Sequence, residues 1–136
     1  MSPLLRNILA FVAGLVVGNV VNMSIIMVSG SIIPPPVGVD PNDMESIKAS
    51  MHLYEAKHFV MPFLAHALGT LVGAFVACKL AITHHLKLGL GMGVLFLIGG
   101  IMMVFMLPSP LTFTIIDLVL SYLPMGWLGY KLSGKP

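Results

Sequence analysis

The sequence has few charged residues. They make up 9% of the 136 residues, with 7 Lys and Arg against 5 Asp and Glu, whereas an ordinary soluble domain carries roughly 25%. So few charges cannot cover the surface of a water-soluble domain of this length, which excludes an ordinary soluble enzyme. The formal net charge of +2 comes without the basic stripe that a phosphate backbone requires, so we expect no nucleic-acid partner.

Cysteine and catalytic motifs are also scarce. The single cysteine, Cys78, excludes an internal disulfide and a CxxC redox pair. His52, Glu55 and His58 invite a metal interpretation, but their i, i+3, i+6 spacing spreads them over about 120° of a helix. That spacing matches no zinc or iron motif. We therefore predict no catalytic set, no metal and no cofactor, although whether the chain is an enzyme stays open.

Long apolar stretches dominate what is present. Hydrophobic residues make up 57% of the chain, and a spanning helix needs about 20 mostly apolar residues. Four stretches qualify, over about 4–28, 59–82, 86–107 and 111–132. They predict an all-α fold, an integral membrane four-helix bundle that forms a single transmembrane domain over residues 1–136. The first stretch lacks a clear A-x-A cleavage site, so we expect an uncleaved anchor.

Positive charge predicts the orientation of these spans. Two of the seven basic residues, Lys48 and Lys57, lie in the long loop 29–58. The other five fall on the opposite side of a four-span arrangement: Arg6, Lys79, Lys87, Lys131 and Lys135. Because basic residues are enriched on the cytoplasmic side, both termini and the short turn at His84–His85 are predicted to be cytoplasmic. The loop 29–58 then lies outside.

The outer loop carries its own helix signal. Pro34–Pro36 cannot continue a helix, but Asp40 followed by Pro41 is a good helix start. Met44, Ile47 and Met51 then recur at helical spacing. We predict a short amphipathic helix from about Pro41 to Met51 at the outer membrane surface, either as a lid over the spans or as a docking surface for another protein.

Small residues recur at intervals of four in three spans, which lets helix backbones approach closely. The glycines of these faces are Gly14, Gly18, Gly69, Gly73, Gly89 and Gly93. They serve packing within one chain or a contact with a membrane-protein partner or a second copy, with packing within the chain favoured. The other expected partner is the lipid bilayer.

Polar residues inside the apolar stretches are the best candidates for a site. Counted at about 1.5 Å per residue, Asn22, His66 and Asp117 fall at one level, about 10 Å below the outer surface. The remaining polar residues lie one turn deeper: Asn19, Thr70 and Ser121. A carboxylate at this depth is costly in hydrocarbon, so Asp117 should face the bundle and find His66, Asn22 or Asn19 as a partner. The group predicts either a structural hydrogen-bond cluster or a site that binds a proton or a small ligand.

The stretches IIPPPVGVDPNDMESIKASMHLYEAKHF and MPFLAHALGTLVGA resemble a set of small four-helix membrane proteins of bacteria. The resemblance covers most of the chain. It implies this topology and a bacterial inner (plasma) membrane, and it implies no activity.

Three classes of function remain open from the sequence. Because no catalytic constellation is present, the favoured class is a non-catalytic accessory or scaffold subunit, or an assembly factor. A small proton-coupled transporter or ligand-binding module is the alternative, because polar residues converge at one level. An intramembrane enzyme acting on a lipid or quinone is the third, because Ser121 lies one turn below Asp117.

Overall fold

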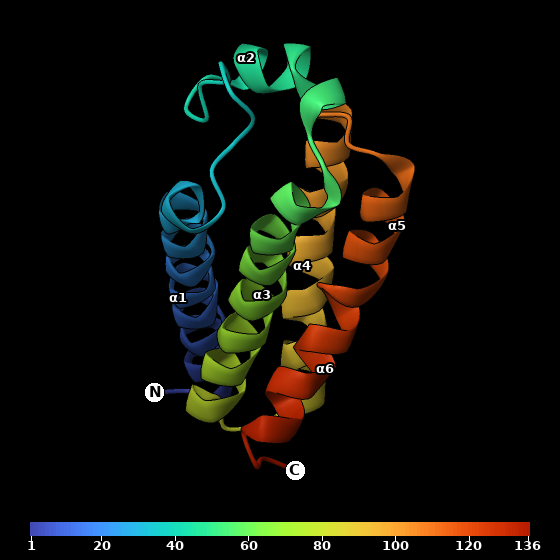
Figure 1. Cartoon of the computed structure of the whole chain (residues 1–136). Coiled ribbons are helices and arrows are strands. Elements are labelled where there is room, and N and C mark those ends of the chain that lie inside the picture. The colour runs from blue at the N-terminus through green and yellow to red at the C-terminus, as the bar shows by residue number, and fades with distance from the viewer.

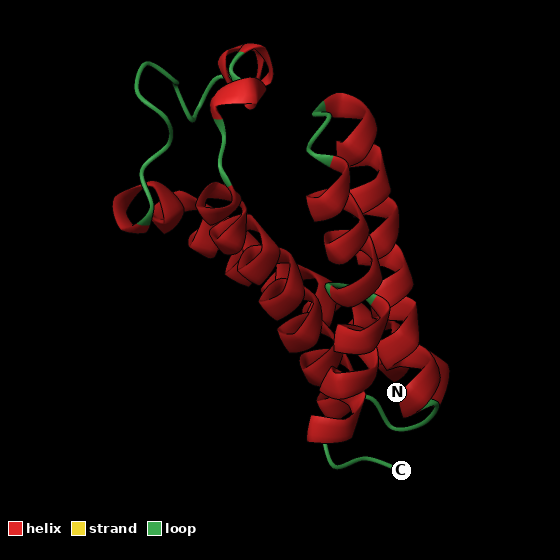
Figure 2. Ribbon diagram, turned by 45° about the vertical axis from the view of Figure 1, so that its right-hand side comes forward, coloured by secondary structure: helices red, strands yellow, loops and turns green.

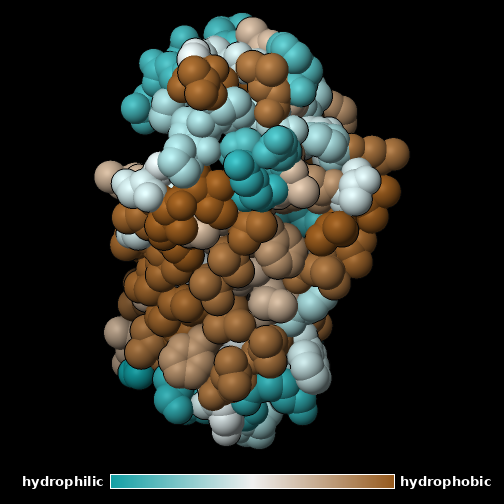
Figure 3. All heavy atoms as spheres, in the orientation of Figure 1, coloured by the Kyte–Doolittle hydropathy of each residue, from teal (hydrophilic) through white to brown (hydrophobic).

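The structure is a computed structural model that describes residues 1–136. It is all-helical, with 78% of residues in helices and no strands. Four segments are long and apolar enough to cross a membrane: Pro3–Ile32, Ala56–Leu80, His85–Met106 and Leu111–Leu132. They run roughly side by side (Figure 1), and apolar atoms cover the middle of the face seen in Figure 3 while polar atoms gather at both ends. These features indicate a helical membrane protein.

The first helix, α1 (Pro3–Ile32), is longer than the predicted 4–28 span. Its N-cap is Ser2, whose side chain accepts a hydrogen bond from the Leu5 N–H at 3.2 Å. Proline at the first helical position suits this start, because its missing N–H would have no partner there. Ile33 ends the helix in an extended conformation, since the residue before a proline is disfavoured in the α region.

The loop after α1 contains a helix, but the predicted start at Pro41 is wrong. Helix α2 covers Met44–Ala49, and its N-cap is Asp43, which accepts from the Glu45 N–H at 3.1 Å. Asp40 instead accepts from the Asn42 N–H at 2.9 Å. An aspartate that bonds its own backbone two residues on forms a turn rather than a helix. The second aspartate therefore takes the capping position.

Two short 3-10 turns follow, η1 (Met51–Leu53) and η2 (Ala56–Phe59), before helix α3 (Val60–Leu80). Helix α4 (His85–Met106) returns after a tight turn. That turn is held by Asn7 of α1, which donates to Thr83 Oγ1 at 2.8 Å and accepts from the Ile82 N–H at 3.0 Å. Asn7 therefore joins the start of α1 to the α3–α4 connection.

The last predicted span, 111–132, is not one helix. It is divided into α5 (Leu111–Leu120) and α6 (Leu123–Leu132), and the break lies at Ser121 and Tyr122. Pro124, in the first turn of α6, explains the break. Proline has no N–H for the carbonyl four residues earlier, and its ring clashes with that carbonyl.

The most extensive helix contact joins α1 and α3. A Cβ atom added at Gly18 would lie 2.7 Å from the Gly69 carbonyl oxygen, and one added at Gly14 would lie 2.9 Å from the Ala77 Cβ. Only glycine permits this approach. In Figure 2 the α1–α3 pair diverges from α4 and α5 toward the end that carries the loop, while α6 packs between α3 and α4 at the other end.

Candidate functional site

Asp117, near the end of α5, is the most buried acidic residue, with 5% of its surface exposed. Its Oδ1 atom lies 2.8 Å from His66 Nδ1 and accepts from Ser121 Oγ at 2.9 Å. Its Oδ2 atom accepts from the Tyr122 hydroxyl at 3.1 Å. Three donors therefore converge on one carboxyl group, and hydrogen bonds to an ionised group are stronger than those between neutral groups.

The helix break assembles these donors. Ser121 lies one turn after Asp117 and shares its face. Tyr122 is the N-cap of α6, two residues past the end of α5, with φ −118° and ψ −77°, so its side chain leaves the regular helical direction and reaches back to Asp117. Gly100 of α4 makes room for the ring, because a Cβ atom there would lie 2.7 Å from Tyr122 Cζ.

His66 belongs to α3, so it approaches the Asp117 carboxylate from a different helix. Since an ionised carboxylate can only accept, Nδ1 carries a proton and donates to Asp117. In the neutral ring this leaves Nε2 as a hydrogen-bond acceptor. Nε2 has no hydrogen-bond partner in the structure, and the ring stacks on Tyr122 with centroids 6.0 Å apart.

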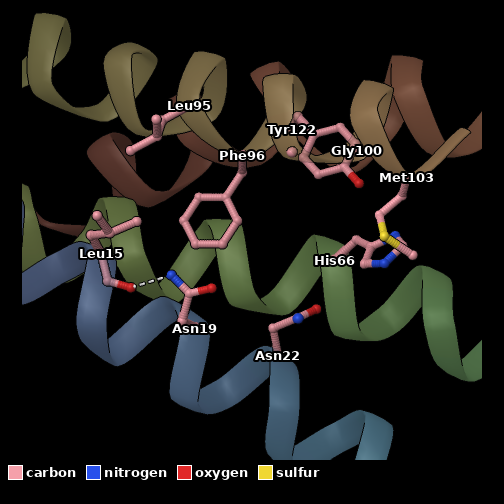
Figure 4. A pocket seen from close by; sticks show the side chains of 10 residues that line it. Leu15, Asn19, Asn22, His66, Leu95, Phe96, Gly100, Met103 and Tyr122 are labelled. Atoms are coloured by element: carbon pink, nitrogen blue, oxygen red, sulfur yellow. Dashed lines mark hydrogen bonds between the residues drawn. The ribbon is translucent and has the colours of Figure 1, made fainter. Parts of the chain in front are cut away.

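A cavity of about 280 Å³ lies next to this pair. Its walls come from α1, α3, α4 and Tyr122 (Figure 4). His66, Asn19 and Asn22 supply polar side chains, and Leu15, Phe96 and Met103 are among the apolar ones. The exposed residues Asn19, Leu95, Gly99 and Met103 mark the opening, at the level of the apolar segments rather than at either end.

The six polar residues singled out from the sequence do not form one network. His66, Asp117 and Ser121 are joined by hydrogen bonds. Asn19 and Asn22 line the cavity but do not reach Asp117. Thr70 is fully buried and donates to its own helix, at the His66 carbonyl, at 2.8 Å.

The two asparagines differ in how their amides are used. Asn19 donates to the Leu15 carbonyl of its own helix at 2.9 Å, as Figure 4 shows. Asn22 makes no hydrogen bond, and its Oδ1 atom is buried without a partner. Because buried polar atoms are nearly always hydrogen-bonded, Asn22 is available to a molecule in the cavity.

Tyr122 also belongs to this cluster, although no sequence pattern indicated it. Its position directly after Ser121 placed it on no shared helical face with Asp117. The signal that could have revealed it is Pro124, two residues later, because proline marks a helix break. Phe96 was missed as well, since one phenylalanine in an apolar span has no distinguishing pattern.

Elsewhere in the chain, no group of three or more His, Cys, Asp or Glu side chains is placed to hold a metal ion. His58 instead uses Nδ1 to accept from the Glu55 N–H at 2.8 Å, which caps the turn before α3.

Comparisons with protein-family models, curated proteins and solved structures found no match to this chain. The resemblance to small bacterial four-helix membrane proteins stays a prediction from the sequence.

Proposed function

We propose that this protein is a single-domain four-helix bundle of a bacterial inner membrane, with both termini and the His84–His85 turn in the cytoplasm. The loop 29–58, with its short helix, then lies outside. The distribution of Lys and Arg between the two ends supports this orientation. The apolar belt between two polar ends in Figure 3 is what a bilayer would cover.

We further propose that the protein binds a small ligand in the cavity beside His66, and that binding is coupled to a proton on the His66–Asp117 pair. The observation that carries this proposal is the 2.8 Å contact between His66 Nδ1 and Asp117 Oδ1 at the edge of a 280 Å³ cavity. An ionisable pair inside a membrane-spanning segment points to a functional site, because burying it there costs free energy.

The chemistry of the pair supports proton coupling. Histidine is the side chain whose charge ordinarily changes between about pH 5 and 8. When Nε2 gains a proton, the imidazolium stays paired with the Asp117 carboxylate, and Nε2 changes from an acceptor to a donor. A molecule that contacts Nε2 therefore binds one protonation state better than the other, which is the requirement for coupling.

The broken helix is a second support. Discontinuous helices at membrane depth line the substrate and ion sites of many transporters, because their unwound backbone is tolerated only next to a cavity or inside protein. The α5–α6 break at Ser121 and Tyr122 lies directly at the Asp117 carboxylate. The accessory or scaffold role favoured by the sequence stays a prediction, because no contact in the structure bears on it. The six glycines of the small-residue faces are buried, and a Cβ atom at each would meet another helix of the same chain, which supports packing within the chain rather than a partner contact.

The experiment is a pH titration of His66 by nuclear magnetic resonance, with ¹⁵N-labelled histidine and the protein in lipid nanodiscs. The His66 signals are assigned by their loss in His66→Gln. We expect the protonation of His66 to change within pH 5–8 and to occur at a different pH in Asp117→Asn. Ser24→Ala is the matched control, because Ser24 is exposed on α1 and bonds only its own helix, at the Val20 carbonyl.

Two results would contradict the proposal. One is a His66 signal that is constant from pH 5 to 8. The other is a titration that is the same in the wild type and in Asp117→Asn, since the carboxylate would then have no influence on the proton.

A further inference from the structure

We infer that the ligand of this cavity is a neutral, membrane-dissolved molecule whose head is a single hydroxylated ring, of the hydroquinone class. This inference rests on the proposed function, since it names the kind of molecule that the site beside His66 and Asp117 would take. It follows from the charge, the free hydrogen-bonding atoms, the size and the opening of the cavity.

The lining excludes a strongly charged ligand. Among the residues that line the cavity there is no Lys, Arg, Asp or Glu, and the ionisable ones are His66 and Tyr122. An anionic headgroup such as a phosphate needs basic side chains or free backbone donors, which this cavity does not offer. Asp117 lies behind His66 and Tyr122, and its oxygens already accept three hydrogen bonds, so a cation gains little there.

The free polar atoms favour a ligand that donates hydrogen bonds. Asn22 Oδ1 is buried without a partner, and the neutral His66 ring leaves Nε2 as an acceptor. Asn19 donates one amide N–H to the Leu15 carbonyl, and its oxygen is an acceptor without a partner. The amide N–H groups of Asn22 are free as well, so the best match is a group that donates to these acceptors and can also accept, as a hydroxyl does. Hydroxyl groups on the ligand would satisfy these atoms, whereas a molecule with carbonyl groups alone would leave Nε2 unpaired.

The volume and the walls favour a single ring. A cavity of about 150 Å³ lined by apolar side chains is enough to hold benzene, so 280 Å³ accommodates a ring with substituents. The Phe96 ring and the Met103 thioether form part of the wall (Figure 4). Both side chains make favourable contacts with aromatic rings.

The opening favours entry from the bilayer. The cavity lies between α1 and α4, and its rim residues Leu95 and Met103 are exposed on the apolar surface. Helices α1 and α4 make few contacts with each other, so the space between them is open to the surface that lipid would cover. A molecule that enters here arrives laterally and leaves its apolar tail in the hydrocarbon.

The test measures binding of decylubiquinol, kept reduced, to the protein in nanodiscs at pH 8, where a histidine is ordinarily neutral. Empty nanodiscs give the partitioning background. We expect saturable binding of one molecule per chain, weakened at least tenfold in Asn22→Leu and unchanged in Ser24→Ala. Oxidised decylubiquinone should bind at least tenfold more weakly, and phosphatidylglycerol should not compete.

A second pair of variants guards against misfolding of Asn22→Leu. A Cβ atom at Gly99, on the cavity wall, or at Gly30, near the end of α1, would meet no atom within 4 Å. Gly99→Leu should therefore fold and block the cavity, whereas Gly30→Leu should fold and bind normally. Binding that is not saturable, equal affinity for both redox forms, or full binding by Gly99→Leu would overturn the inference.

The two proposals fail separately. If no hydroquinone binds but the His66 titration depends on Asp117, the ligand class is wrong and the proton site stands. If hydroquinone binds through Asn22 but His66 does not titrate between pH 5 and 8, the ligand class stands and the coupling to a proton is wrong.

Discussion

The contact between α1 and α3 makes a sharp prediction about stability, and Gly14→Ala tests it. The added Cβ would meet the Gly73 carbonyl oxygen and lie 2.9 Å from the Ala77 Cβ and 3.0 Å from the Ala77 nitrogen. None of these atoms can rotate away, because two belong to the backbone and the third is attached directly to it. The two helices must therefore move apart along the seam.

The size of the effect follows from two opposing contributions. Overpacking of this kind costs about 1–3 kcal/mol, while alanine favours a helix over glycine by about 1 kcal/mol. Gly14→Ala should therefore lower the free energy of unfolding by up to about 2 kcal/mol. The control, Gly30→Ala, lies in the same helix with no atom within 4 Å of the new Cβ, so it should be neutral or stabilising.

The difference between the two variants cancels the helix preference and isolates the overpacking, which should amount to about 1–3 kcal/mol. Reversible unfolding of each variant in mixed micelles of neutral detergent and dodecyl sulfate, followed by circular dichroism, gives this difference. A Gly14→Ala protein that is at least as stable as Gly30→Ala would refute the reasoning, because α1 and α3 could not then lie as close as described.

Three further predictions concern other contacts. Asn7→Ala should lower the free energy of unfolding by about 1–3 kcal/mol, because it removes the bond to Thr83; unchanged micelle unfolding would contradict this. Tyr122→Phe should cost about 1 kcal/mol by removing one donor from Asp117, and should move the pH at which His66 titrates; a titration identical to wild type would contradict this. Burial raises the pKa of the Tyr54 phenol above its ordinary 10.0, so its contribution to stability is present below pH 10 and lost as pH rises through the folded-state pKa. Ultraviolet titration against Tyr54→Phe measures this shift; ionisation at the ordinary pH would contradict it.

The sequence predicts some of this architecture because hydrophobic length is a strong signal. Four apolar segments appear where the stretches of about 20 apolar residues lie. Helix ends and interruptions are decided by single residues, and these were harder to predict. Pro124 breaks the last segment, although its position within an apolar run hid the break. Two aspartates three residues apart both resemble an N-cap in the sequence, so the pattern could not show that Asp43 rather than Asp40 caps the loop helix.

The site shows a similar division. Depth along a helix can be counted from the sequence, so Asn22, His66 and Asp117 could be placed at one level. Rotation about the helix axis cannot be counted in this way, since it depends on how neighbouring helices pack. The packing in the structure turns Thr70 toward its own helix, and it places Asn22 at the cavity but out of reach of Asp117. Neither outcome could be predicted from depth alone.

The contact between His66 and Asp117 is the central claim, and a double-mutant cycle tests it most directly. The free energy of unfolding is measured for wild type, His66→Gln, Asp117→Asn and the double variant, in the same micelles at pH 5.5 and pH 8. We predict that the two substitutions are coupled and that the coupling energy is larger at pH 5.5, where a protonated His66 faces the carboxylate. Additive effects at both pH values, or a coupling that does not depend on pH, would contradict the account.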